Sequence, residues 1–298
     1  MLYRLRRQLA RRRFEQSCRS VRVTPPLRPV PAPVTILSMV SHADVIMYLI
    51  AIKSLYRRLG RGNILIIDDG SLTDDDRDFL SEHLARPKIV PLSALDTGRC
   101  PRGGTWERLL LILEISADEY VIQLDSDTLA QDRLDEVVDC IESNRAFTLG
   151  TRMGQRFDSL SDAAARIADL SGDHVQMVAE RALARFDSLD QRRYVRGSSG
   201  FAGFARGGFG RAQLEAFSVQ MRGLIGDKWT EWGSEQVASN FVVANSSSAR
   251  ILPYPKYACF DLRMDPRTSA FLAFHRHQPL RSRGLCRARQ SSHEQLRP

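Results

Sequence analysis

Acidic and hydroxyl side chains follow apolar runs at three points along the chain. Each run has the length and composition of a buried strand, and each polar cluster begins where its run ends. Ligands of open parallel sheets bind beyond the carboxyl ends of the strands, so we expect the three clusters to share one edge of a sheet. Their convergence argues for a binding site more strongly than any one cluster does. The clusters are Ser38 with Ser41, Asp68-Asp69-Gly70-Ser71, and Asp125-Ser126-Asp127.

The last cluster has the spacing of a metal site. Asp125 and Asp127 stand two residues apart in a turn after an apolar strand, so both carboxylates can face one hard cation. Mg²⁺ and Mn²⁺ prefer carboxylate oxygens and complete their shells with water and substrate phosphate. Such a cation would neutralise a departing diphosphate. The alternative is a helix cap for a helix beginning near Asp132, but the second acidic strand end upstream favours the metal site.

A second set of candidates lies in the later half of the chain. A short segment there combines two indoles with two carboxylates, which suit the apolar face of a sugar ring and a general base towards an acceptor hydroxyl. A glycine-rich segment before it would let backbone approach a substrate closely. Alternatively, the tryptophans anchor the core, the acids face solvent and the glycines form a packed turn. The candidates are Gly200, Trp229, Glu231, Trp232, Glu235 and Gln236.

Strand and helix patterns alternate from residue 34 to residue 130. The apolar residues of 45–59 fall on one helical face, Ser41 is a suitable N-cap, and Gly60 ends the pattern. The strand runs are continuously apolar, as strands buried on both faces are. The alternation implies crossover helices on a mostly parallel sheet. We therefore predict an α/β fold: a single domain with a mostly parallel, Rossmann-like sheet flanked by helices and a less regular, acceptor-binding second half.

This pattern resembles the nucleotide-binding half of GT-A glycosyltransferases, closely over residues 34–130 and loosely over 195–275. The motifs that carry the resemblance are Ile66-Ile67-Asp68-Asp69-Gly70-Ser71 and Val121-Ile122-Gln123-Leu124-Asp125-Ser126-Asp127. The resemblance implies Mn²⁺- or Mg²⁺-dependent transfer of a sugar from a UDP- or GDP-sugar to a hydroxyl of a glycan or small-molecule acceptor. It also implies a set of donor-binding positions. These are Ser38, Val40, Ser41, Asp68 or Asp69, Asp125, Ser126 and Asp127. The segment Asp68-Asp69-Gly70-Ser71, taken alone, could also be only a turn, since Asp, Gly and Ser are ordinary turn residues.

The resemblance bears on catalysis as well. Glu235-Gln236 with Asn240 is similar to a segment of retaining GT-A enzymes, whereas a single glutamate base, Glu235 or Glu231, would suit inversion, so the stereochemistry stays open. Many GT-A enzymes also place a late histidine on the metal. His275 is the candidate for that third ligand, with His277 nearby.

Phosphate contacts should come from arginine, because the chain has only four lysines and a guanidinium binds phosphate in a bidentate manner. Arg102 and Arg108 lie between the expected third and fourth strands and are the candidates, although either would also serve as a solvated surface charge.

The net charge of +8 is concentrated at the two ends of the chain. Residues 1–30 hold nine arginines and one acid, and residues 276–298 hold six and one, so the stretch between them is net acidic. A nucleic-acid-binding domain would carry positive charge on the fold itself. We expect a basic arm and proline-rich linker at 1–33, a domain at 34–275 divided near residue 130, and a basic tail at 276–298.

Residues 1–14 fit either a solvated arm or a basic amphipathic helix on an anionic membrane surface. No run approaches the ~20 apolar residues that span a bilayer. The five cysteines are scattered without CxxC pairs, which fits a reducing compartment. These features predict a cytoplasmic protein, with membrane contact confined to the arm.

Other enzyme classes fit less well. Leu124 to Thr128 matches the DxDxT nucleophile motif of haloacid-dehalogenase-like phosphatases, but that motif opens its domain and is followed by a paired-Asp motif absent here. A sugar-nucleotide pyrophosphorylase would need a glycine-rich loop after the first strand, and a P-loop NTPase would need GxxxxGK[ST]. The remaining alternative is a catalytically inactive, nucleotide-binding scaffold docked through its basic arm.

Overall fold

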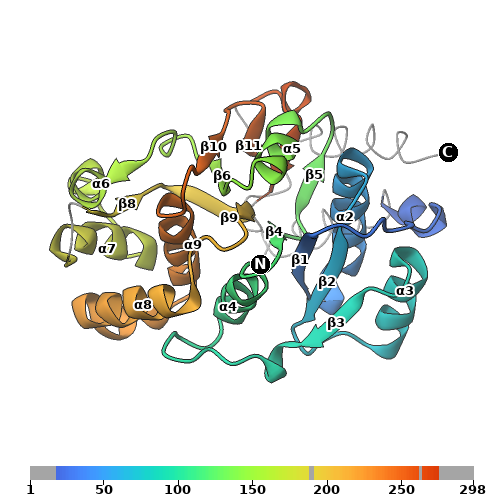
Figure 1. Ribbon diagram of the computed structural model, residues 1–298, viewed down its shortest axis with the longest axis horizontal. Helices are drawn as coiled ribbons and strands as arrows, with labels where there is room; N and C mark the ends of the chain where they lie inside the picture. Colours follow the sequence, from blue (N-terminus) through green and yellow to red (C-terminus); the bar gives the residue numbers. More distant parts are fainter. Residues whose placement is uncertain (1–17, 188–190, 262–263, 275–298) are drawn as a thin grey trace, which may run out of the picture.

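A seven-stranded sheet organises the computed structural model, which describes residues 18–187, 191–261 and 264–274 (Figure 1). Its strand order is β10-β6-β9-β4-β1-β2-β3. All neighbouring pairs are parallel except those of β9, which runs antiparallel to both β4 and β6. The predicted mostly parallel α/β architecture is confirmed. The strands are β1 (Val34–Val40), β2 (Asn63–Asp68), β3 (Lys88–Pro91), β4 (Tyr120–Leu124), β6 (Phe147–Gly150), β9 (Gly197–Phe204) and β10 (Arg250–Leu252).

Helices cover both faces of this sheet. Successive side chains of a strand point to opposite faces, and accordingly Ile36 and Leu37 of β1 enter two different core clusters. The cluster around Ile36 includes the buried face of α2, and the cluster around Leu37 includes those of α4, α8 and α9. The helices are α2 (Val45–Leu59), α3 (Asp74–Leu84), α4 (Trp106–Ile115), α5 (Asp135–Glu142), α6 (Leu160–Ile167), α7 (Val175–Ala182), α8 (Arg211–Ile225) and α9 (Ser234–Ala244).

Two small sheets complete the described part of the chain. The order β11-β12-β5 joins β5 (Thr128–Ala130), directly after the Asp125–Asp127 turn, to β12 (Phe271–Ala273) and β11 (Tyr257–Cys259). β7 (Asp158–Ser159) pairs with β8 (Arg193–Tyr194). The chain after β12 therefore lies beside the turn Asp125-Ser126-Asp127, which we call the DSD turn.

The helix predicted over 45–59 forms as expected, and Gly60 ends it in the left-handed region at φ +70°. Ser41 is not its N-cap. A 3₁₀ turn, η2 (His42–Asp44), precedes the helix, and the Ser41 hydroxyl donates to Asp44 at 2.6 Å instead. In the second half of the chain, the helices α6 and α7 are separated by an irregular segment containing Gly172 at φ +140°.

The proline-rich segment lies against the fold rather than apart from it. Cys18 and Val21 are fully buried in the core, and the Lys53 ammonium holds Thr24 and Pro25. Further along, the Val30 carbonyl accepts from the Gly62 N–H at 2.9 Å. Packing therefore begins at least sixteen residues before the expected boundary at residue 34. The arm 1–14, the tail 276–298 and His275 lie outside the described residues.

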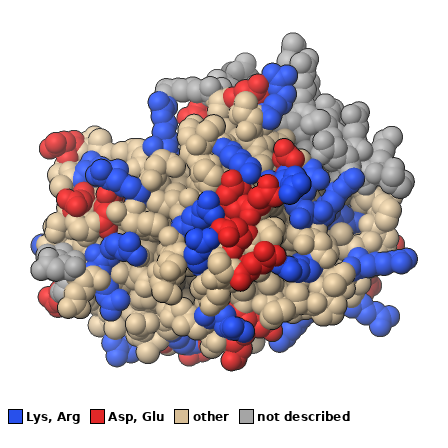
Figure 2. Space-filling view, turned by 45° about the horizontal axis from the view of Figure 1, so that its top comes forward, with Lys and Arg blue, Asp and Glu red and all other residues tan. Residues whose placement is uncertain are grey.

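Charges on the folded part are mixed. On the face drawn in Figure 2, acidic side chains gather near the middle and basic side chains lie on both sides of them. Among the helices that the structure describes, none has the length and apolar character to cross a membrane.

Candidate active site

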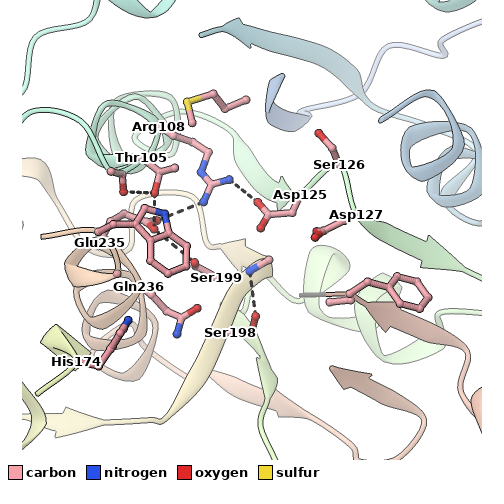
Figure 3. Close-up of a pocket in the computed structure, with 17 residues that line it drawn as sticks. Thr105, Arg108, Asp125, Ser126, Asp127, His174, Ser198, Ser199, Glu235 and Gln236 are labelled. Atoms are coloured by element: carbon pink, nitrogen blue, oxygen red, sulfur yellow. Dashed lines mark hydrogen bonds and ion pairs between the residues drawn. The ribbon is translucent and has the colours of Figure 1, made fainter. Parts of the chain in front are cut away.

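A pocket of about 410 Å³ lies at the carboxyl ends of β1 and β4. The antiparallel strand β9 begins at this same edge, so its first residues contribute a wall, and the first turns of α4 and α9 contribute two more. The polar side chains that line it are Thr105, Arg108, Asp125, Ser126, Asp127, His174, Ser198, Ser199, Glu235 and Gln236 (Figure 3).

A buried guanidinium joins the two sides of the pocket. Arg108, on the first turn of α4, has a side chain only 5% exposed and donates through Nη1 to Asp125 Oδ1. Its Nη2 lies 3.6 Å from Glu235 Oε1. Burial opposes the charge of Arg108, but the two carboxylates outweigh that effect and raise its pKa. One cation thus serves two anions.

Glu235 is held from several directions. Its Oε2 accepts from the Thr105 hydroxyl at 2.8 Å and from the Ser199 hydroxyl at 3.4 Å. The side chain is 3% exposed, and burial raises its pKa despite the neighbouring Arg108. Glu235 therefore lies at the pocket wall as a fixed counter-ion of Arg108, where the sequence suggested a general base.

The Asp125–Asp127 turn is tied to two distant parts of the chain by backbone hydrogen bonds. The Asp125 N–H donates to the Gly200 carbonyl at 2.9 Å, and the Phe274 N–H donates to the Asp127 carbonyl at 2.8 Å. Asp125 Oδ2 faces Gly200, where an added Cβ would approach it to 3.4 Å. The lack of a side chain at Gly200 thus leaves space beside the carboxylate oxygen that Arg108 does not take.

Within the described residues, no group of three or more His, Cys, Asp or Glu side chains is arranged around a common metal position. The predicted ligands Asp125 and Asp127 both line the pocket, whereas the third, His275, lies outside the described part of the chain. Two carboxylates suffice for a cation that keeps waters and shares substrate phosphates. The residues present therefore fit a Mg²⁺ or Mn²⁺ ion, whose binding here stays a prediction.

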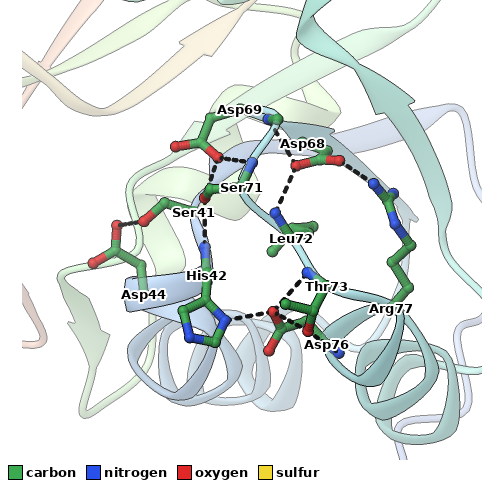
Figure 4. A network of polar contacts seen from close by, with 11 residues as sticks. Ser41, His42, Asp44, Asp68, Asp69, Ser71, Leu72, Thr73, Asp76 and Arg77 are labelled. Atoms are coloured by element: carbon green, nitrogen blue, oxygen red, sulfur yellow. Dashed lines mark hydrogen bonds and ion pairs between the residues drawn. The ribbon is translucent and has the colours of Figure 1, made fainter.

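The acidic turn after β2 is occupied by its own chain (Figure 4). Asp68 is 1% exposed. Its Oδ1 accepts from the Gly70 and Leu72 N–H groups at 2.9 and 3.2 Å, and its Oδ2 pairs with Arg77. It holds the turn and presents no surface to a nucleotide, contrary to the sequence-based expectation. Asp69 is exposed and accepts from the Ser71 N–H at 2.9 Å.

The turns after β1 and β2 are linked to each other. The His42 N–H donates to Ser71 Oγ at 2.9 Å, and His42 Nδ1 lies 2.6 Å from Asp76 Oδ2 (Figure 4). Ser38 and Val40 are fully buried, so neither side chain lines the pocket, contrary to the expectation from the sequence. Met39, between them, lines it instead, because alternate residues of a strand face opposite sides.

The acceptor candidates separate into pocket and non-pocket residues. Trp232 is 64% exposed and lines the pocket, as do Gly200 and Gln236. Trp229 is fully buried, donates to Ser218 Oγ at 2.9 Å and packs edge-on against Trp106, so it has no face to offer a sugar. The core-anchor alternative is correct for this residue.

Two further candidates lie away from the pocket lining. Glu231 forms an ion pair with Lys228 at 2.9 Å, with half of its side chain exposed. Arg102 is exposed and donates to the Leu95 carbonyl at 3.3 Å. Both are surface charges in this structure, because each already has a local partner outside the cavity. Arg108 alone of the two arginine candidates reaches the pocket.

Sequence reasoning missed Thr105, His174, Ser198 and Ser199. Thr105 adopts φ +77° after Gly103 and Gly104, and this glycine pair before a helix was the available signal. His174 is the N-cap of α7. Nothing in the local pattern around His174 indicated a pocket.

Comparisons with known protein families and with curated proteins find no match. Solved structures similar to the chain include glycosyltransferases. The galactosyltransferase LgtC, in complex with donor and acceptor sugar analogues, has a TM-score of 0.46 and 9% identity, over 87% of this chain and 95% of LgtC. The mannosyltransferase Ktr4p of S. cerevisiae has a TM-score of 0.41 and 12% identity, over 96% and 91%. TarS of S. aureus with UDP-GlcNAc has a TM-score of 0.41 and 11% identity, over 84% and 60%.

Proposed function

We propose that this chain is a glycosyltransferase that transfers a sugar from a UDP- or GDP-sugar to an acceptor hydroxyl with the help of Mn²⁺ or Mg²⁺. The observation that carries the proposal is the content of one pocket at the carboxyl edge of the sheet. It brings the carboxylates of a DSD turn, a buried guanidinium and an exposed indole together. Cationic, anionic and aromatic groups of this kind suit a charged donor and a sugar.

The donor diphosphate would bind between the DSD turn and Arg108. Arg108 fixes Oδ1 of Asp125, and Oδ2, over Gly200, would hold the cation together with Asp127, which also lines the pocket. When bound, this cation neutralises the charge that develops on the leaving diphosphate. The Arg108 guanidinium adds a preorganised positive charge beside the same position.

Glu235 would act as a positioning residue. It touches Arg108, Thr105 and Ser199, and its side chain is almost fully covered. Its negative charge keeps Arg108 from pairing with Asp125 alone, so Asp125 retains charge for a cation. Gln236, the next residue, donates through Nε2 to Gln176 Oε1 at 3.2 Å and stands at the pocket lining, where it can contact substrate.

Calorimetric titration tests the donor site. UDP, GDP, CDP and ADP would be titrated into the protein with and without Mn²⁺, and into Asp127→Asn. The exposed Asp132→Asn is the matched control, because it removes a nearby carboxylate outside the pocket. We expect one nucleotide to bind with Mn²⁺ and to lose at least tenfold in affinity in Asp127→Asn only.

The outcomes separate the competing functions. Failure of all four nucleotides in both conditions would contradict the donor site. Nucleotide binding without consumption of any UDP- or GDP-sugar, either by acceptor or by water, would favour the inactive scaffold instead.

A further inference from the structure

One end of the pocket carries an aromatic pair without fixed charge. His174 and Trp232 come from the segments before α7 and α9, and their ring centroids lie 6.3 Å apart at 83°. Figure 3 shows His174 on the side of Gln236, away from Asp127. The other two tryptophans of the chain, at positions 106 and 229, are 1% and 0% exposed, whereas Trp232 is 64% exposed. The exposed indole of Trp232 therefore lacks the stabilisation that burial gives to Trp106 and Trp229.

The proton of His174 has a defined place. Nδ1 accepts from the Gln176 N–H at 3.2 Å, which makes the side chain the N-cap of α7. A nitrogen that accepts carries no proton, so the neutral ring holds its proton on Nε2. The edge with Nε2 faces Gly233, where an added Cβ would stand 3.0 Å from Cε1 and 3.5 Å from Nε2. A side chain at position 233 would therefore crowd this edge of the ring, and the φ of +106° favours glycine there as well.

The support under His174 is rigid. Gln176 Nε2 donates to Glu180 Oε1 at 3.0 Å, and Glu180 is 1% exposed and also bound by Tyr194 and Arg196. Gln236, from α9, donates to Gln176 and so ties the two helices together at this end of the pocket. A ring fixed before the ligand arrives loses little conformational entropy on binding.

We propose that His174 and Trp232 bind a sugar ring of the acceptor, which makes the acceptor a saccharide. The indole packs on the apolar face of a pyranose, and the Nε2–H of His174 donates to one of its hydroxyls. The charged lining residue nearest this end, Glu235, is only 3% exposed and lies 3.6 Å from Arg108. The surface that this end offers is therefore aromatic and uncharged, which suits a neutral ring, whereas Asp125 and Arg108 stand at the diphosphate end. The inference rests on the proposed function, because it names the acceptor class for the same pocket.

The test uses methyl pyranosides of glucose, galactose, mannose and N-acetylglucosamine, and a Ser/Thr-containing peptide. Saturation-transfer NMR would measure binding with and without UDP and Mn²⁺. His174→Asn keeps a good N-cap acceptor but shortens the side chain, and Trp232→Phe keeps an aromatic face that Trp232→Ala removes. Asp227→Asn, an exposed substitution in the segment before Trp232 and outside the pocket, is the control.

We expect at least one pyranoside to bind. His174→Asn should weaken it about fivefold, the loss of one hydrogen bond, and Trp232→Ala about tenfold, with Trp232→Phe in between and Asp227→Asn unchanged. The affinity for UDP with Mn²⁺ should not change in any of these variants. The proposal would be overturned if none of the four pyranosides bound, either with or without UDP and Mn²⁺. It would also be overturned if the peptide bound in a manner that depends on His174 and Trp232. Failure of the nucleotide to bind would instead count against the donor site, and the pyranoside titrations in its absence would still be decisive.

Discussion

At the scale of single residues, the pocket is built around an imbalance of charge. Arg108 is one buried cation between Asp125 and Glu235, so each carboxylate has only part of a counter-charge. Removing one member of a buried ionic group leaves an uncompensated charge, which costs more than the group itself contributes. The stability and the chemistry of the pocket therefore depend on the same guanidinium.

Arg108→Met should lower the free energy of unfolding by about 3–5 kcal/mol at neutral pH. The loss should shrink as the pH falls, because burial and the charge of Asp125 raise the pKa of Glu235 and the variant lacks the guanidinium that opposes them. That carboxyl then takes up a proton in the folded state, and its repulsion with Asp125 disappears. Urea unfolding at pH 7 and pH 4.5 measures both values. Arg102→Met, which replaces an exposed arginine six residues before Arg108, is the control. An equal loss at the two pH values would contradict the ionic explanation.

Truncation of the two tryptophans in the segment 229–232 should change the free energy of unfolding by very different amounts. Trp229→Ala removes a fully buried indole and should cost about 3–5 kcal/mol of unfolding free energy. Trp232→Ala removes an exposed one and should change it by less than about 0.5 kcal/mol. Denaturant titration of both variants, read by circular dichroism, checks the contrast. A large loss in Trp232→Ala would mean that this indole supports the fold.

At the scale of elements, sequence periodicity predicted the strands and the first helices because burial on both faces leaves a plain apolar signature. It did not predict which side chains of β1 face the pocket. In the run Ser38-Met39-Val40, the order of polar and apolar residues does not indicate which side chains share a face of the sheet. In the structure Met39 lines the pocket, and Ser38 and Val40 are buried. Asp68 was misassigned for a related reason, because an aspartate that holds a turn looks the same in sequence as one that binds a ligand.

The N-terminal segment should be held in a pH-dependent manner. Lys53 donates to Thr24 Oγ1 at 2.7 Å and lies 3.0 Å from His83 Nδ1. Burial, together with the charge of Lys53, lowers the pKa of His83, while Glu82 raises it and Arg22 acts in both directions. A histidine with a lowered pKa stays neutral when folded, so the unfolded chain takes up its proton first. Stability is then lost as pH falls through about 6.5.

His83→Asn should flatten this pH dependence. In the wild-type protein the slope of unfolding free energy below pH 6.5 can reach about 1.4 kcal/mol per pH unit for one proton. Urea unfolding between pH 5 and pH 7.5 would measure it in both proteins. Equal slopes in wild type and His83→Asn would refute the role of His83.

Burial also lowers the pKa of Lys53, to about 8, so its contribution has the same sign as that of His83 but falls in a higher pH range. Between pH 8 and 10.5 the unfolded lysine binds more protons than the folded one, and stability should rise with pH across that range. Lys53→Met should remove this rise, which is measured as the difference between the two proteins because cysteines and tyrosines also titrate there.

At the scale of the whole molecule, the site is assembled from segments that the sequence keeps far apart. The DSD turn contacts α4 through Arg108, β9 through Gly200, and the chain after β12 through Phe274. Local patterns predicted the turn itself, because strand and motif coincide there. Thr105 follows β3, so the parallel topology alone places it at this edge, and the glycine pair before it was the available signal. His174 was beyond reach, because it belongs to the long connection between β6 and β9, whose course the local pattern does not indicate.

This assembly predicts that the donor site and global stability are linked. A ligand at 100 times its dissociation constant stabilises the folded state by about 2.7 kcal/mol, so UDP with Mn²⁺ should raise the unfolding temperature of the wild-type protein by a few degrees. Gly200→Ala is the informative variant. Gly200 does not need a left-handed backbone, but its new Cβ would stand 3.4 Å from Asp125 Oδ2 and fill the space beside it.

We therefore expect Gly200→Ala to keep the unfolding temperature of the unliganded protein within about one degree, since the added methyl group at this buried position meets no atom closer than 3.4 Å. It should lose the increment from UDP with Mn²⁺. Calorimetric scans of both proteins, with UDP alone, Mn²⁺ alone and the two together, separate the contributions. Gly210→Ala, where the nearest group to a Cβ is Gln213 at 3.7 Å and the pocket is remote, should keep the full increment. A Gly200→Ala protein that is stabilised as much as the wild type would show that the cation does not use the Asp125 oxygen over Gly200.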